Sequence, residues 1–159
     1  MTLVLLGTQN NSFHRLLEEV QKNIDNGNIK DEVVVQKGYT KFESPDMQIY
    51  DQVPVEKMKE LVKQADLVIT HGGVGSIITA IEQGKKVIAV PRLKKYKEHV
   101  NDHQLDIIKS FNGAGYIIGI QDVSKLPKAL EEAKKFIPQK YVQNTGKILQ
   151  LVSDFIDNH

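Results

Sequence analysis

The clearest fold signal of the chain is Leu67-Val68-Ile69-Thr70-His71-Gly72-Gly73-Val74-Gly75-Ser76. Its first four residues form a short apolar run, which is typical of a strand buried on both faces in a parallel sheet. A glycine-rich turn follows at residues 71–76, and a helix is expected at 77–83, ending at Gly84. Another strand is expected at 86–90, before Pro91. The stretch therefore predicts consecutive strand, turn, helix and strand, as in a parallel sheet.

The same alternation extends in both directions along the chain. Further strands are expected at residues 3–6, 32–36, 47–50 and 115–120, and further helices at 56–64, 99–111, 124–136 and 141–156. A helix capped by Ser12 precedes the turn at 26–28, with Phe13, Leu16, Leu17, Val20 and Ile24 on one face. Alternating strands and helices predict a doubly wound α/β fold. We expect one Rossmann-like domain over residues 1–159, a parallel sheet with helices on both faces.

The composition excludes several classes of function. The 21 basic and 20 acidic side chains nearly cancel, so the chain lacks the basic excess that nucleic-acid binding requires. There is no cysteine, which excludes disulfides, thiolate catalysis and thiolate metal sites. The apolar start is too short for a signal peptide, and no apolar run approaches the roughly 20 residues that cross a bilayer. We expect a cytoplasmic protein that reaches a membrane only through a surface patch or a partner.

The glycine-rich turn has the chemistry of an anion site. Ligands of open parallel sheets bind beyond the carboxyl ends of the strands. Gly72, Gly73 and Gly75 allow the backbone to approach a ligand closely. The helix that opens near Ser76 offers unpaired N–H groups and a partial positive charge to a diphosphate, and the Ser76 hydroxyl can donate to the same anion. The turn is neither a Walker loop nor Gly-x-Gly-x-x-Gly, and a tight turn without a ligand is the alternative.

A long polar connection after residues 86–90 reaches the same edge of the sheet. Asp102 and Gln104 can bind sugar hydroxyls, and the alternative is a solvated helix start with Asp102 or Asn101 as its cap. Histidines and carboxylates lie near one another here. The Asp-x-Asp pair of many metal-dependent sugar transferases is absent, however, and no metal is expected.

Other charged residues have two interpretations each. The basic run Arg92, Lys94, Lys95 and Lys97 is either a solvated loop or a contact with lipid phosphate or an anionic membrane. His14, early in the first helix, is either a surface residue or an acid–base group, since the ordinary histidine pKa of about 6.5 lies near operating pH.

Three blocks of sequence together resemble one family. They are residues 65–76, 84–91 and 102–104. They resemble the donor-binding, C-terminal half of the GT-B glycosyltransferases, as in the MurG family and in the small catalytic subunit of the dolichol-pathway N-acetylglucosaminyltransferase. Capsule and exopolysaccharide transferase subunits of the PssE/EpsF type look closer still, because segments 7–17 and 91–99 also match their pattern. The resemblance covers nearly the whole chain.

The resemblance implies a binding role for each matching position. It places the diphosphate of a UDP-sugar at the glycine turn, the uracil against segment 52–55, and the donor sugar against Asp102 and Gln104. Thr79 stands where many relatives have the ribose-binding glutamate, and Glu82, about one helical turn on, is its expected substitute. No cofactor is implied. The implied substrate-binding residues are Gly7, Thr8, Val53, Pro54, Val55, His71, Gly72, Gly73, Gly75, Ser76, Thr79, Glu82, Asp102 and Gln104.

The resemblance also implies a two-part, inverting glycosyltransferase, from which UDP leaves. The chain fits the donor half only, so the acceptor half is expected on a membrane-anchored partner subunit, which recruits this chain to the cytoplasmic face of the membrane. The implied acceptor is a polyprenyl-diphosphate-linked glycan of capsule or exopolysaccharide synthesis. The implied donor is UDP-galactose or UDP-N-acetylglucosamine, with UDP-glucose and UDP-glucuronate as further options. His14 is the one candidate base, and a homo-oligomer is compatible with the sequence.

Two rival functions remain open on the sequence. One is a non-catalytic nucleotide-binding subunit that regulates polysaccharide synthesis. The other is a dehydrogenase-type dinucleotide domain, which is disfavoured because the glycine turn follows a middle strand and the usual fingerprint is absent.

Overall fold

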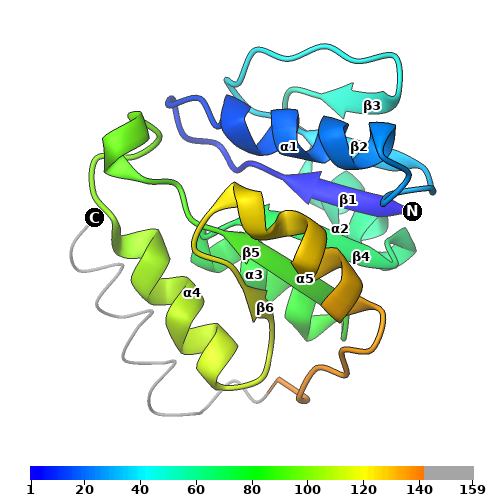
Figure 1. Ribbon diagram of the computed structural model, residues 1–159, viewed down its shortest axis with the longest axis vertical. Coiled ribbons are helices and arrows are strands. Elements are labelled where there is room, and N and C mark those ends of the chain that lie inside the picture. The colour runs from blue at the N-terminus through cyan, green and yellow to red at the C-terminus, as the bar shows by residue number, and fades with distance from the viewer. Residues whose placement is uncertain (142–159) are drawn as a thin grey trace.

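The computed structural model describes residues 1–141, and these residues contain a six-stranded parallel sheet (Figure 1). The strand order is β3-β2-β1-β4-β5-β6. This is the order of a doubly wound sheet, in which the direction of progression reverses between β1 and β4. The predicted α/β fold is confirmed. The strands are β1 (Thr2–Leu5), β2 (Val33–Gln36), β3 (Met47–Tyr50), β4 (Leu67–His71), β5 (Lys86–Val90) and β6 (Ile118–Gly119).

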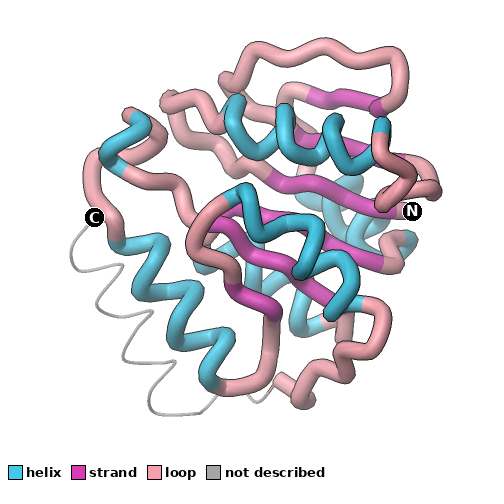
Figure 2. The backbone as a smooth tube through the Cα atoms, viewed as in Figure 1, coloured by secondary structure: helices cyan, strands magenta, loops and turns pink. Residues whose placement is uncertain are grey.

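Helices cover both faces of the sheet (Figures 1 and 2). The helices α1 (His14–Asp25) and α5 (Leu126–Ala133) pack on one face, and α2 (Val55–Gln64), α3 (Val74–Glu82) and α4 (His103–Gly113) pack on the other. Along β1, Val4 belongs to the first core, whereas Leu3 and Leu5 belong to the second. Strand side chains alternate between the faces, so a strand covered on both sides is apolar throughout.

The start of α1 differs from the prediction. Ser12 is exposed, and the helix begins at His14 with the buried Phe13 before it and no side-chain cap. Thr40, in the loop after β2, binds the N-cap residue, because its Oγ1 accepts from the Phe13 N–H at 2.9 Å. The acceptor lies 27 residues away along the chain. A local cap pattern does not show it.

The start of α3 also differs. The helix begins at Val74, where the sequence predicted residue 77, and Gly73 precedes it in an extended conformation. Val74, Gly75 and Ser76 therefore form the first helical turn. The loop between β4 and α3 consists of Gly72 and Gly73 alone.

Three elements after β5 are shorter than predicted. Residues 99–102 are not helical; a 3₁₀ turn, η1 (Lys94–Tyr96), follows β5, and α4 begins only at His103. The strand predicted at 115–120 is confined to β6. The helix predicted at 124–136 is a 3₁₀ turn, η2 (Val123–Lys125), followed by α5. The helix predicted at 141–156 lies, apart from its first residue, outside the described residues. Between residues 1 and 141, no helix has the length and apolarity to cross a membrane.

Candidate functional site

A cavity of about 350 Å³ opens where the strand order reverses. The loops after β1 and β4 meet there because these strands are neighbours, with Leu5 beside Thr70. The first turn of α3 forms one wall. Ligands of open α/β sheets bind at such a reversal. The lining residues are Leu5, Gly7, Thr8, Gln9, Met58, His71, Gly73, Val74, Gly75, Ser76 and Thr79.

The first turn of α3 presents backbone donors at this cavity. The first N–H groups of an α-helix have no acceptor within the helix. In α3 the Ile77 N–H reaches Gly73 O at 3.1 Å, which leaves the N–H groups of Val74, Gly75 and Ser76 without a helical partner. The helix dipole adds roughly half a positive charge, and the first turn contains no acidic residue. This wall can therefore bind an anion such as a diphosphate.

Gly75 faces open space. A Cβ at this position would meet no atom within 4 Å outside its own helix turn. Gly7 and Gly73 differ, because a Cβ at either would lie 2.5 and 2.4 Å from the nearest imidazole atom of His71. Packing on His71 therefore requires glycine at positions 7 and 73. The packing does not require it at 75, where the missing side chain leaves room for a ligand to approach the backbone.

His71 lies between these glycines as a buried, neutral imidazole. Burial, followed by the nearby Arg92 charge, lowers the pKa of His71 from 6.5 to about 3. Gln104 Oε1 accepts from the backbone N–H groups of Gly72 and Arg92, each at 3.0 Å, so its Nε2 faces His71 Nδ1 at 3.1 Å. This hydrogen-bond network assigns the ring proton to Nε2. Nε2 lies 3.4 Å from Ser76 Oγ, and both groups stand beside the α3 wall.

Gln104 is not among the residues that line the cavity, and its contact with the donor sugar stays a prediction. The side chain is fully buried, and its bonds join the ends of β4 and β5. Asp102 is exposed but is not among the lining residues; its Oδ1 accepts from Lys94 N at 2.8 Å. Asp102 is the N-cap residue of α4, but its side chain makes no cap hydrogen bond; Asn101 Oδ1 accepts from the His103 N–H at 3.0 Å. These residues shape the connection that follows β5.

Thr79 and Glu82, on the same helix, line two different cavities. Thr79 lines the cavity, and its hydroxyl donates to Gly75 O at 2.8 Å. Glu82 lines a different cavity, next to residues 138–141. The substitution of Glu82 for a ribose-binding glutamate stays a prediction, and Thr79 is the polar residue of this helix face that lines the cavity.

The segment predicted to receive the uracil lies outside the cavity lining. Val53 packs against the core, Pro54 precedes α2 as its N-cap, and the Val55 side chain is 69% exposed. Met58, one turn into α2, lines the cavity in their place. Residues 52–55 lead into α2, and Met58 is an apolar residue of the cavity wall.

His14 lies at the surface, as the first of its two interpretations expected. Its Nε2 pairs with Glu18 at 2.7 Å, its Nδ1 contacts Lys41 O at 3.0 Å, and its ring packs edge-on against Phe42. It is not among the residues that line the cavity. The acid–base role of His14 therefore stays a prediction without support from the cavity lining.

In the basic run, the arginine is buried and the three lysines are exposed. Arg92 is 1% exposed, and its guanidinium donates to the carbonyls of Leu6, Asn11 and Glu98. Burial lowers the pKa of Arg92 to about 10, so the group stays charged at neutral pH. The interpretation of the whole run as one exposed patch is wrong for this residue. The exposed cations are Lys94, Lys95 and Lys97.

The site residues missed from the sequence are those without a distinctive chemistry. Gln9 follows Gly7 and Thr8 at the end of β1, and its amide lies 2.9 Å from His99 Nε2. Its position after the first strand was the available signal. Leu5, Met58 and Val74 are apolar, and their pattern indicates only a core position.

Two relatives overlap the chain over a short stretch. The chain is 36% identical over 62 residues to the UDP-N-acetylglucosamine transferase subunit ALG13 of Homo sapiens and to that of Mus musculus. Each match covers 39% of this chain and 5% of the relative, so the chain spans a small part of the length of these proteins.

Solved structures share the fold over nearly the whole chain. The glycotransferase of kitacinnamycin matches with a TM-score of 0.61 and 20% identity, over 96% of this chain and 37% of that one. MurG of Acinetobacter baumannii matches with a TM-score of 0.56 and 18% identity, over 98% and 49%. The expected GT-B donor-half fold is thereby confirmed. Residues 1–158 also match the sequence profile of one family, and the chain therefore belongs to the glycosyltransferase family 28 C-terminal domain family.

Proposed function

We propose that the chain binds a UDP-sugar in the cavity beside α3 and is the catalytic subunit of a two-component inverting glycosyltransferase. One observation carries the proposal: the unpaired N–H groups of Val74, Gly75 and Ser76 line an open cavity at the reversal of the sheet order. Membership of a glycosyltransferase family supports the reaction class. The name of the relative ALG13, a UDP-N-acetylglucosamine transferase subunit, supports a uridine nucleotide.

The mechanism follows from where charge develops. The acceptor hydroxyl attacks the anomeric carbon from the face opposite the diphosphate, the bond from that carbon to the β-phosphate oxygen breaks, and UDP leaves with the bonding electrons. Negative charge then grows on the diphosphate. The first turn of α3 and the Ser76 hydroxyl are preorganised donors for this charge. The His71 Nε2–H is a third donor, and it stays neutral across physiological pH because its pKa is about 3.

The same low pKa excludes His71 as the base that takes the acceptor proton at neutral pH, since a group of that pKa is a weak base. His14 lies away from the cavity. We assign the base to the acceptor-binding partner, which completes the cleft. The proposed partner is membrane-anchored and binds a polyprenyl-diphosphate-linked glycan of capsule or exopolysaccharide synthesis. UDP-N-acetylglucosamine and UDP-galactose are the first donors to screen.

Calorimetry on the purified chain tests the binding step. UDP and UDP-sugars should bind, and NAD should not. Binding of NAD in preference to UDP would favour the dinucleotide-domain alternative and contradict the proposal.

A transfer assay tests the reaction. Radiolabelled donor sugars are incubated with lipid-linked acceptor and the chain, with and without a co-expressed acceptor-binding subunit. Transfer should require both proteins. Full activity of the chain alone would contradict the two-component assignment. UDP binding without transfer in the presence of the partner would favour the regulatory subunit.

A further inference from the structure

A basic turn projects beside the proposed donor site. It comprises η1 and Lys97 (residues 94–97), and its three lysines are exposed. Figure 1 shows it at the carboxyl edge of the sheet, next to the loop after β1. Two contacts join that loop to the connection that carries the turn: Asn11 Nδ2 donates to Lys97 O at 3.1 Å, and the cavity residue Gln9 contacts His99. The turn and the cavity therefore share one edge of the molecule.

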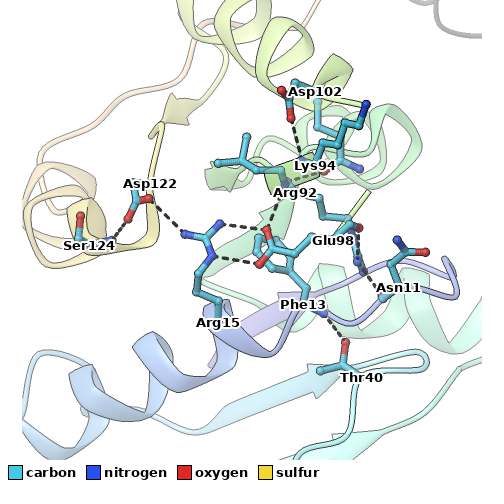
Figure 3. A network of polar contacts seen from close by, with 12 residues as sticks. Asn11, Phe13, Arg15, Thr40, Arg92, Lys94, Glu98, Asp102, Asp122 and Ser124 are labelled. Atoms are coloured by element: carbon cyan, nitrogen blue, oxygen red, sulfur yellow. Dashed lines mark hydrogen bonds and ion pairs between the residues drawn. The ribbon is translucent and has the colours of Figure 1, made fainter. Parts of the chain in front are cut away.

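A buried ionic network holds the turn from below (Figure 3). Glu98 is 3% exposed and pairs with Arg15 through two hydrogen bonds of 3.0 Å. Its Oε1 also accepts from the Leu93 N–H at 3.1 Å. Arg92, on the same connection, binds three backbone carbonyls. Buried charges are costly unless they are paired, so a network of this kind fixes one backbone arrangement.

The two ends of the turn are fixed as well. At its start, Asp102 Oδ1 accepts from the Lys94 N–H at 2.8 Å. At its end, Lys97 has a φ of 59°, and it is the one non-glycine residue with positive φ in the described part of the chain. A lysine adopts this conformation only when its surroundings impose it. The lysines are thus presented by a rigid turn.

The charge of the region is positive once its acids are counted. Glu98 and Asp122 both pair with Arg15, and Asp102 binds the Lys94 backbone. Tyr96 lies among the lysines, 45% exposed, with the Arg15 guanidinium 4.1 Å from its ring centroid. The turn therefore presents a surface of flexible cations around one aromatic ring, which has an apolar body and a polar tip.

We propose that this basic turn contacts anionic phospholipid headgroups and thereby orients the donor cavity toward a membrane surface. The proposal rests on the proposed function, in which the acceptor is lipid-linked. Headgroup phosphates lie in a plane that several separate ammonium groups can reach at once, and each basic residue near such a surface strengthens binding. Three lysines give the chain weak binding that is measurable at low salt, whereas stable attachment needs a second signal. The partner subunit supplies that signal.

Vesicle co-sedimentation of the full chain at low salt tests the proposal. The probe is phosphatidylcholine vesicles with and without phosphatidylglycerol. The test variant is Lys94→Gln/Lys95→Gln/Lys97→Gln. The control, Lys30→Gln/Lys134→Gln/Lys135→Gln, removes the same charge at the opposite edge of the sheet, where Lys30 and Lys134 line a cavity beside the first residues of β1 and β5. Thermal shifts with UDP are measured on all three proteins.

The wild type should sediment with the phosphatidylglycerol vesicles and not with phosphatidylcholine alone. The turn variant should lose about a hundredfold in vesicle affinity, roughly fivefold per lysine, and the control should stay near wild type. Equal losses in both variants, equal binding to neutral vesicles or no vesicle binding would each overturn the proposal. If the turn variant kept vesicle binding but no longer bound the partner subunit, the proposed membrane contact would be wrong, and the basic turn would instead contact the partner protein. An absent UDP shift in every protein would instead count against the donor site alone.

Discussion

Replacing Gly75 with alanine separates a role in folding from a role in binding. A Cβ there meets no atom within 4 Å, and the position lies in the first turn of α3 without a positive φ. Alanine restricts the unfolded chain and favours the helix, so Gly75→Ala should stabilise the chain without ligand by about 0.4 to 1 kcal/mol. For a chain of this length that corresponds to a rise in Tm of about 1 to 4 °C.

In the proposed complex, the same methyl group occupies space next to the diphosphate. If it displaces one charge-assisted hydrogen bond from the α3 amides, UDP binding weakens by roughly 1.5 to 3 kcal/mol, which is tenfold or more. Thermal denaturation of the apo chain and calorimetry with UDP measure the two effects. Gly73→Ala is the contrasting variant, because its Cβ would lie 2.4 Å from the His71 ring and should destabilise the fold. Loss of apo stability in Gly75→Ala, or unchanged UDP affinity, would refute the reasoning.

Three further predictions concern buried polar groups. Gln104→Glu keeps an acceptor for two backbone N–H groups but places an oxygen against His71 Nδ1. ¹⁵N NMR should therefore show the ring proton on Nδ1, and UDP should bind more weakly. An unchanged tautomer would contradict the assigned network. Between about pH 6.5 and 3, His71 binds a proton in the unfolded chain but not in the folded chain. The stability that depends on neutral His71 should therefore be fully present above pH 6.5 and fall as the pH decreases. Urea unfolding should show a smaller fall in His71→Asn, and an equal fall would contradict this role of His71. Glu98→Gln should lower the free energy of unfolding by roughly 3 kcal/mol because it leaves Arg15 without its buried partner, whereas Glu131→Gln at an exposed pair should change it little.

The fold was predictable because buried strands and glycine turns leave local signals. The strands at 47–50 and 86–90 have the predicted bounds, and each other strand overlaps its prediction. Strands covered on both faces are short apolar runs, and positive-φ glycines such as Gly27 and Gly84 end helices. Helix starts were less predictable. Ser12 does not cap α1, and the N-cap residue Phe13 instead donates to Thr40, a contact made only in the folded chain.

The cavity lining was predictable at the glycine turn, whereas the hydrogen bonds of the connection after β5 were not. The sequence places Asp102 and Gln104 at the correct edge of the sheet. It does not show that backbone N–H groups of the fold use their oxygens, because that depends on burial. Arg92 was misjudged for the same reason: its lysine neighbours indicated solvent, whereas the carbonyls that it binds come from elements distant in sequence.

A crystal structure of the chain with UDP tests the central claim most directly. The account predicts diphosphate oxygens within about 3.2 Å of the backbone nitrogens at Val74–Ser76, with the Ser76 hydroxyl beside them. A nucleotide bound elsewhere, with no anion at the first turn of α3, would contradict it.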